Sequence, residues 1–254
     1  MNPALWLTRS AVVRADAPAL HRGTECVSTY AGFAGAAAAV AGALRNRYAI
    51  APGDRVAIFS ANSPEYLEAL YGIWFAGAAA VPINAKLHVR EAAWIIGNAG
   101  ARVVFSSARL QDELREAVGE DVRIVALDGP VFAEIRRGER MAEPHPVHAD
   151  DLVWLFYTSG TTGRPKGVMI TAGNVMAMAL GHLADVDSMG PDDAALYAAP
   201  ISHGAGLYNF MHVMRATPHI VPASGGFGAA EIFAIARKIG SICMFAAHHG
   251  GRRE

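Results

Sequence analysis

The chain has 254 residues, 52% hydrophobic and 18% charged, which excludes a disordered polymer and provides enough apolar mass for a sizeable core. Its 22 Lys and Arg nearly balance its 23 Asp and Glu, so the net charge of −1 gives no indication of a nucleic-acid partner. The uncharged stretches are rich in alanine or interrupted by glycine, proline and histidine, so we expect no transmembrane segment.

Strand-like runs alternate with helical runs in the first half of the chain. This pattern is typical of an α/β protein with a largely parallel sheet. Thr29 is a suitable N-cap, and Ser63 followed by Pro64 marks another helix start. In chain order we predict helix 4–14, hairpin strands 19–21 and 26–28, helix 29–47, strand 54–59, helix 62–77, strand 79–82, helix 90–98, strand 102–105, helix 108–118 and strand 122–127.

A polar stretch with two prolines, 136–150, predicts an exposed connector between two α/β subdomains, 1–135 and 151–247. Thr171 is expected to cap the first helix beyond the loop described below. The second subdomain is predicted to contain strands 151–156 and 167–170, helix 171–184, strand 194–198, a short helix ending near 215, strand 217–221, helix 229–238 and strand 241–245. Residues 248–254 form a tail outside this pattern.

Residues 157–167 read Tyr-Thr-Ser-Gly-Thr-Thr-Gly-Arg-Pro-Lys-Gly and lie between two apolar, strand-like runs. Glycines allow backbone N–H groups to converge on one anion, and the hydroxyls at 158, 159, 161 and 162 add further donors. Lys166 adds a mobile positive charge. The segment therefore predicts a phosphate-binding loop, although a solvated turn is the other structure that such a cluster can form.

A Walker A loop, Gly-x-x-x-x-Gly-Lys-Ser/Thr, is the nearest alternative pattern. Here Pro165 precedes Lys166 and Gly167 follows it, so no hydroxyl is available there for magnesium. A strand-like run then replaces the helix that a Walker A loop requires. The sequence thus disfavours a kinase or GTPase.

The loop closely resembles the signature of the AMP-forming adenylating superfamily, which includes acyl-CoA synthetases, luciferases and peptide-synthetase adenylation domains. Segments 54–57, 62–65, 74–78 and 81–84 are similar to the early strands and helices of that family. The resemblance implies an α/β fold: part of the N-terminal large domain of the acyl-CoA synthetase/luciferase-like fold, with a mostly parallel sheet and flanking helices.

The resemblance also implies a ligase of the acyl-CoA synthetase type, which activates a fatty or aryl carboxylic acid with ATP and Mg²⁺ through an acyl-adenylate and then forms a thioester with coenzyme A. It implies an enzyme of fatty acid metabolism. Arg9, Arg14 and Asp16 stand where a signal peptide would have its apolar core, so we expect a cytoplasmic protein. Lys166 would stabilise the charge of the departing pyrophosphate. Arg164 is expected to face solvent, and no metal ligands are assigned here. The residues expected to bind the β- and γ-phosphates are Thr158, Ser159, Gly160, Thr161, Thr162, Gly163 and Lys166.

Residues 200–206, Pro-Ile-Ser-His-Gly-Ala-Gly, resemble the segment that borders the acyl pocket in acyl- and aryl-CoA synthetases. His203 is therefore predicted to border an acyl pocket, and it favours a plain carboxylic acid over an amino acid. The alternative is a histidine that only packs against or caps the following helix. The family often has a Thr/Ser-His-x-Asn segment after the loop, whereas this chain has Thr-Ala-Gly-Asn at 171–174.

Later motifs of the family have no counterpart in this sequence: Tyr-Gly-x-Thr-Glu for adenine and magnesium, Thr-Gly-Asp for the ribose, and the lysine of a small C-terminal domain. We therefore expect a truncated fragment with exposed apolar surface and without autonomous adenylation. Two alternatives stay open. One is a non-catalytic remnant that binds nucleotide phosphate or a partner, and the other is an enzyme whose C-terminal half is a separate polypeptide. Cys26 and Cys243 lie in apolar contexts and are predicted to be buried thiols.

Overall fold

A computed structural model of the protein describes residues 1–158, 165–190 and 192–245. The helices are α1 (Ala4–Val13), α2 (Tyr30–Asn46), α3 (Pro64–Phe75), α4 (Val89–Ala99), α5 (Gln111–Ala117), α6 (Pro130–Ile135), α7 (Ala172–Asp185), α8 (Gly204–Leu207), α9 (Asn209–Arg215) and α10 (Ala229–Ile239), with a 3₁₀ turn at Ala108–Leu110. The strands are β1 (Pro18–Arg22), β2 (Glu25–Thr29), β3 (Arg55–Ser60), β4 (Ala79–Asn84), β5 (Val103–Ser106), β6 (Arg123–Ala126), β7 (Leu152–Thr158), β8 (Lys166–Thr171), β9 (Asp193–Leu196), β10 (His219–Val221) and β11 (Ser241–Met244).

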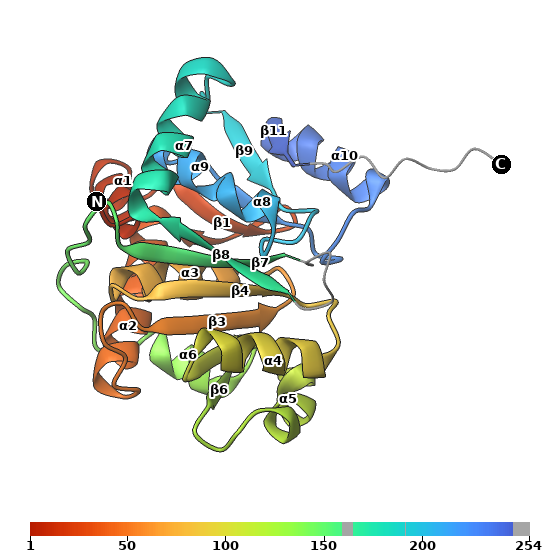
Figure 1. Ribbon diagram of the computed structural model, residues 1–254. Coiled ribbons are helices and arrows are strands. Elements are labelled where there is room, and N and C mark those ends of the chain that lie inside the picture. The colour runs from red at the N-terminus through yellow and green to blue at the C-terminus, as the bar shows by residue number, and fades with distance from the viewer. Residues whose placement is uncertain (159–164, 191, 246–254) are drawn as a thin grey trace.

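The described strands form two mixed, mostly parallel sheets (Figure 1). The six-stranded sheet has the order β6-β5-β3-β4-β7-β8, and only its edge strand β8 is antiparallel to its neighbour. The five-stranded sheet has the order β11-β9-β10-β1-β2, with β2 antiparallel at the edge. The predicted α/β class with a largely parallel arrangement is confirmed, but the strands divide between two sheets.

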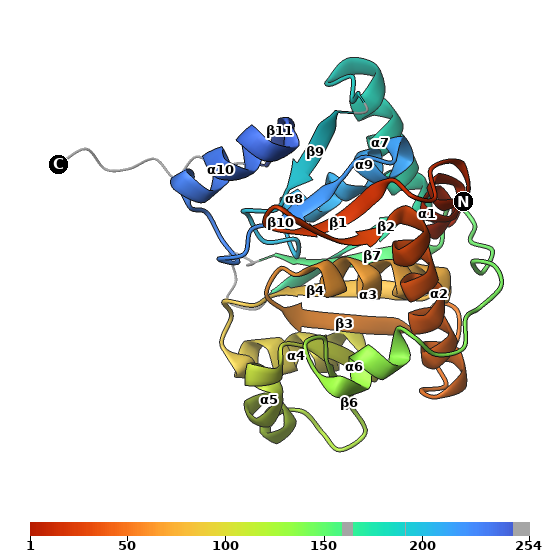
Figure 2. The same ribbon diagram turned by 180° about the vertical axis from the view of Figure 1, so that it is seen from behind.

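Alternation along the strands explains how the helices are layered. In β3, Val56 and Ile58 belong to the core shared with α2 and α3, whereas Ala57 and Phe59 belong to the core shared with α4 and α5. Successive side chains of a strand point to opposite faces, so the six-stranded sheet is covered on both sides. Figure 2 shows α2 and α3 in front of this sheet, and both helices also contact β1. The helix pair α2–α3 therefore lies between the two sheets.

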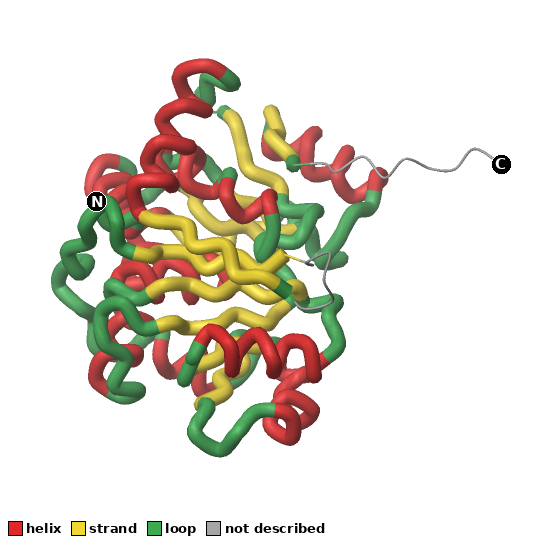
Figure 3. The backbone as a smooth tube through the Cα atoms, in the orientation of Figure 1, coloured by secondary structure: helices red, strands yellow, loops and turns green. Residues whose placement is uncertain are grey.

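The outer face of the five-stranded sheet is covered by α10. Ile235 of α10 packs with Ala194, Leu196 and Ile220 from β9 and β10. Figure 3 shows α10 (red) beside β9 and β11, above the larger sheet. This helix buries Ile235 and leaves Phe233 67% exposed. The cover on this side is thus thinner than on either face of the six-stranded sheet.

Three predicted helix starts are confirmed by their caps. The Thr29 hydroxyl accepts a hydrogen bond from the Gly32 amide at 3.2 Å. The Ser63 hydroxyl accepts from the Tyr66 amide at 3.1 Å, and the Thr171 hydroxyl accepts from the Asn174 amide at 3.2 Å. Each side chain satisfies one of the amides that the first turn of a helix leaves unpaired.

The connector 136–150 has no helix or strand and is mostly exposed. Its backbone nevertheless docks on the middle layer, because the Met141 and His145 amides donate to Ala38 and Phe75 carbonyls at 3.1 and 2.9 Å. Each sheet takes strands from both sides of the connector: β1 pairs with β10, and β4 pairs with β7. The connector therefore does not separate one sheet from the other, and a division into two units along the chain stays a prediction.

The expectation of buried cysteines was wrong. Cys26 is exposed because β2 is an edge strand whose middle residues face solvent, and Cys243 on the edge strand β11 is partly exposed. Edge position, which the local apolar pattern does not reveal, is the physical reason. Within the described residues, none of the helices combines the length and apolar character needed to cross a membrane.

Candidate functional site

The predicted phosphate-binding loop connects the two strands of a hairpin at one end of the six-stranded sheet. Thr158, the last residue of β7, stands opposite Lys166, the first residue of β8, and both are exposed. Figure 1 shows this end of the hairpin on the side toward which β3 and β4 also point. The structure thus brings together the first and last predicted phosphate ligands. The predicted ligands Ser159, Gly160, Thr161, Thr162 and Gly163, like Arg164, lie outside the described residues.

Tyr157 anchors this end of the hairpin to α4. Its hydroxyl donates to the Asn98 side chain at 2.6 Å, and its ring meets that of Trp94 edge-on at 6.3 Å. Burial raises the pKa of the Tyr157 phenol, so it stays a neutral donor. A Cβ at Gly167 would lie 3.1 Å from both the Leu155 side chain and the Tyr157 ring, so only glycine leaves this contact relaxed. The strand ends that present Thr158 and Lys166 are therefore fixed by packing.

His203 lies beside the same hairpin. Its ring meets Phe156 of β7 edge-on at 5.5 Å, and its Nδ1 is 3.4 Å from the Ser202 hydroxyl. Although His203 occupies the N-cap position of α8, its side chain makes no capping hydrogen bond, and it is exposed. The imidazole is thus free to face a ligand, and it is positioned by β7 through the ring contact with Phe156.

A cavity of about 510 Å³ is lined by Ala205 and Tyr208, which follow His203 in the chain. We call it the β9–α9 cavity, since its walls are β9, α8, α9, β11 and the segment after α7. Its volume lies within the range of about 300–1,000 Å³ typical of small-molecule sites. At its mouth, the ring of Phe245 lies so close to Gly204 that a Cβ there would be 3.1 Å away. Glycine at 204 therefore lets the aromatic mouth approach the backbone beside His203.

A buried polar network supports the inner end of this cavity. The Tyr197 hydroxyl is 2.8 Å from Nδ1 of His219, and Nδ1 of His212 is 2.7 Å from the Thr217 hydroxyl. The Tyr30 hydroxyl donates to the Thr217 carbonyl at 2.7 Å. These bonds tie α2, β9, α9 and β10 together around the cavity wall.

Burial determines the protonation of this network. It lowers the pKa of His212 to about 4, against the opposing effect of Asp193, and lowers that of His219 well below its usual value. It also raises the pKa of Tyr197. All three side chains are consequently neutral near pH 7. His212 and Tyr197, which both line the cavity, were not predicted from the sequence. A histidine nine residues after His203 was the one local signal, and it does not reveal that both side chains face one cavity.

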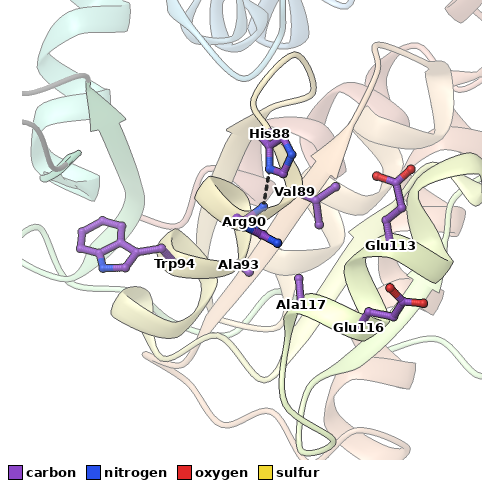
Figure 4. A pocket seen from close by; sticks show the side chains of 8 residues that line it. All are labelled: His88, Val89, Arg90, Ala93, Trp94, Glu113, Glu116 and Ala117. Atoms are coloured by element: carbon purple, nitrogen blue, oxygen red, sulfur yellow. Dashed lines mark hydrogen bonds between the residues drawn. The ribbon is translucent and has the colours of Figure 1, made fainter.

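Two other hollows are less suited to a site of chemistry. One of about 300 Å³ lies at the carboxyl ends of β3 and β4, with Lys86, Arg109 and Phe227 in its wall. Another, of about 640 Å³, lies between α4 and α5 on the far side of the six-stranded sheet (Figure 4). Its charged residues Arg90, Glu113 and Glu116 are exposed, and Figure 4 shows the Trp94 side chain pointing away from the two carboxylates. This hollow is an open groove between surface helices.

Among the described residues, no three His, Cys, Asp or Glu side chains are grouped in a way that could hold a metal ion. The described part of the site therefore supplies hydroxyl, ammonium and imidazole groups, and no acidic ligand set for magnesium.

Comparison with known proteins assigns the chain to a family. The family model described as AMP-binding enzyme matches residues 7–247. A feruloyl-CoA synthase from Amycolatopsis sp is 36% identical over 203 residues, which are 80% of this chain and 40% of that protein. A crotonobetaine/carnitine–CoA ligase from Escherichia coli is 34% identical over 168 residues, 61% of this chain and 32% of the relative. The chain thus spans about 40% or less of the length of these two curated relatives.

Solved structures show the same fold. An o-succinylbenzoate coenzyme A synthetase from Bacillus subtilis superposes with a TM-score of 0.82 at 23% identity, covering 95% of this chain and 61% of that one. The inhibitor-bound N-terminal domain of FACL13 from Mycobacterium tuberculosis gives a TM-score of 0.80 at 30% identity, covering 92% of this chain and 60% of that one. Together with the match over nearly the whole sequence, these likenesses establish that the chain belongs to the AMP-binding enzyme family, among the acyl-CoA synthetases and ligases.

Proposed function

We propose that this chain is the phosphate- and acyl-binding part of an AMP-forming acyl-CoA ligase. The observation that carries the proposal is the juxtaposition of Thr158 and Lys166 with His203 and the mouth of the β9–α9 cavity. A charged phosphate site beside a cavity lined by both apolar and polar side chains suits a reaction between ATP and a carboxylic acid. The family membership supports this reading.

In the proposed reaction, a carboxylate oxygen attacks the α-phosphorus of ATP, the bond to the β-phosphate oxygen breaks, and pyrophosphate leaves. The thiol of coenzyme A then attacks the acyl carbonyl, and AMP leaves as the thioester forms. We assign Lys166 to the β- and γ-phosphates, where its ammonium would offset the charge that accumulates on pyrophosphate. The hydroxyls and amides assigned to the same phosphates are those of Thr158, Ser159, Gly160, Thr161, Thr162 and Gly163.

The acyl group is assigned to the β9–α9 cavity, with its carboxylate at the mouth beside His203. Met189, Leu196 and Met244 give the cavity an apolar wall, which suits a fatty or aryl acid. One relative is named for a feruloyl thioester, and a structural neighbour from Mycobacterium tuberculosis with a TM-score of 0.80 at 28% identity is named a fatty acyl CoA synthetase. Both names support a carboxylic acid substrate in this proposal.

A second candidate function is phosphate binding without catalysis. It is favoured by the exposed pair Thr158 and Lys166 at the end of the β7–β8 hairpin, which can bind an anion without any further reaction step. In this second candidate function the chain binds nucleotide phosphate or a partner and activates no acid.

Titration calorimetry with ATP and with pyrophosphate tests the phosphate site. We expect both to bind, and Lys166→Ala to weaken binding by about tenfold or more, since a hydrogen bond to a charged group contributes about 1.5–3 kcal/mol. Lys238→Ala is the matched control, because this lysine lies on α10, where its ammonium is 3.4 Å from the Thr24 hydroxyl of the β1–β2 turn. Equal binding by wild type and Lys166→Ala would contradict the assignment.

Acid-dependent exchange of pyrophosphate into ATP separates the two candidate functions. We expect no exchange from the pure chain. Exchange that appears only when a separately expressed C-terminal half of a related ligase is added would support the ligase assignment. Binding of ATP without exchange under either condition would favour the second candidate.

A further inference from the structure

The β9–α9 cavity has a rim and a floor of different character. Tyr208 and Phe245 at the rim are 37% and 36% exposed, whereas Tyr197 and His212 are each 1% exposed. The rim is the end next to His203, because Gly204 touches the Phe245 ring. An acid with its carboxylate at the rim would therefore place the opposite end of its acyl group on Tyr197 and His212.

The polar atoms of the floor differ in whether they are already bonded. The Tyr197 hydroxyl is paired with His219 at 2.8 Å, and Nδ1 of His212 is paired with Thr217 at 2.7 Å. Nε2 of His212 makes no hydrogen bond with any residue that the structure describes. A ligand that fills the cavity would displace water from this nitrogen, so a ligand that pairs with it gains affinity over one that leaves it unpaired. The cavity thus offers this ring nitrogen among apolar side chains such as Met189 and Leu196, with the polar His182 and Asp187 also in its wall.

The chemistry of this nitrogen indicates what it would bind. The imidazole is neutral near pH 7, since burial lowers its pKa to about 4. In a neutral ring Nε2 is a donor or an acceptor according to the tautomer, and a hydroxyl can pair with either. A second carboxylate is disfavoured, because Asp187 and Asp193 already place negative charge near the ring.

We propose that Nε2 of His212 selects acids that carry a neutral hydroxyl at the end remote from the carboxylate, with hydroxylated aryl acids as the class that fits the apolar walls. This inference rests on the proposed function, because it requires that the β9–α9 cavity be the acyl site. It makes His212 a specificity-determining residue, with Thr217 and Tyr197 holding the floor in place.

The test measures binding of free acids to the full chain, so it requires no catalysis. The probes are 4-hydroxycinnamic acid and 4-methylcinnamic acid, which differ in one group of similar size, with 4-carboxycinnamic acid as the charged comparison. We expect the hydroxy acid to bind about three- to tenfold more tightly than the methyl acid, as one added hydrogen bond implies. The carboxy acid is expected to bind more weakly than the hydroxy acid.

Variants assign this preference to one residue. His212→Leu should reduce the ratio of the two affinities to near one, and His212→Gln, which keeps a polar atom at the floor, should retain part of it. His148→Leu is the matched control, because this histidine is exposed in the connector, and it should keep the full ratio. If His212→Leu does not fold, the ¹⁵N shift of the His212 ring in the wild type decides, and it should respond to the hydroxy acid much more than to the methyl acid.

The outcomes separate this inference from the proposed function. Equal affinity for the hydroxy and methyl acids, an unchanged ratio in a folded His212→Leu variant, or tighter binding of the carboxy acid would overturn the hydroxyl selection and leave the acyl site standing. Binding of none of the acids would overturn both.

Discussion

The two sheets of this protein differ in how completely they are covered. The six-stranded sheet has α2–α3 on one face and α4–α5 on the other, so successive residues of β3 and β4 are buried on both sides. The five-stranded sheet shares α2–α3, and among the elements that the structure describes α10 alone covers its outer face. The β9–α9 cavity opens beside it. The first region provides a closed core on which the loop-bearing hairpin is built. The second provides the space that a ligand can enter.

The largest expected effect on stability comes from Trp74, which lies where the two sheets meet. Trp74 of α3 is buried against Tyr71, Trp154 and Phe210, and its indole N–H donates to the Val153 carbonyl at 2.8 Å. We expect Trp74→Ala to lower the free energy of unfolding by about 3–5 kcal/mol, measured by urea denaturation. Trp94→Ala, which truncates a half-buried tryptophan on α4, should lower the free energy of unfolding clearly less. Equal losses for the two would mean that the junction is not the tighter core.

The next effect is electrostatic and lies in the layer between the sheets. Glu68 of α3 is fully buried, and its carboxylate pairs with the Arg136 guanidinium of the connector at 2.5 Å. Glu65 nearby pairs with Arg22 of β1 at 3.1 Å. Arg136→Ala should destabilise the protein by roughly 3 kcal/mol, because it leaves a buried carboxyl unpaired. Arg137→Ala, which removes an exposed neighbouring side chain, should change the free energy of unfolding by less than about 0.5 kcal/mol. A similar loss in the Arg136→Ala and Arg137→Ala variants would show that the pair of Glu68 and Arg136 does not stabilise the protein.

The same carboxyl predicts a pH dependence. Burial raises the pKa of Glu68 to about 7, although Arg136 opposes the shift. A folded-state pKa above the unfolded value means that the folded protein binds more protons, so the stabilising contribution of Glu68 is present at low pH and is lost as pH rises from about 4.5 to 7. Thermal unfolding of Glu68→Gln over this range should show a smaller decline than the wild type. A wild-type stability that rises more steeply than that of Glu68→Gln would contradict the raised pKa.

The sequence predicted more of the first region than of the second. Caps at Thr29, Ser63 and Thr171 and the apolar run of β3 are local signals, so they placed elements correctly. The pairing of β1 with β10 joins residues about two hundred positions apart, and no local pattern indicates that a second sheet forms. The helix α6 also went unpredicted, because its six residues after Gly129 are too few to show a helical periodicity.

The candidate site likewise has one part that the sequence predicted and one part that it did not. The opposition of Thr158 and Lys166 follows from two apolar runs on either side of a short loop, which predicts a hairpin. Tyr197 and His212 line the inner part of the β9–α9 cavity, and their polar atoms are held by His219 and Thr217. That depends on burial and distance between elements, which the residue types alone do not encode.

The smallest expected effect on stability lies at the thin cover of the five-stranded sheet. Phe233 of α10 is 67% exposed and Ile235 is buried, although both belong to one helix. Phe233→Ser should change the free energy of unfolding by less than about 0.5 kcal/mol, whereas Ile235→Ala should cost about 2 kcal/mol. The exposed ring should instead affect association, so Phe233→Ser should lower the binding of the dye ANS and the light scattering of concentrated solutions. A large loss of stability in Phe233→Ser would show that α10 packs its outer side as well, and the contrast between the two sheets would then disappear.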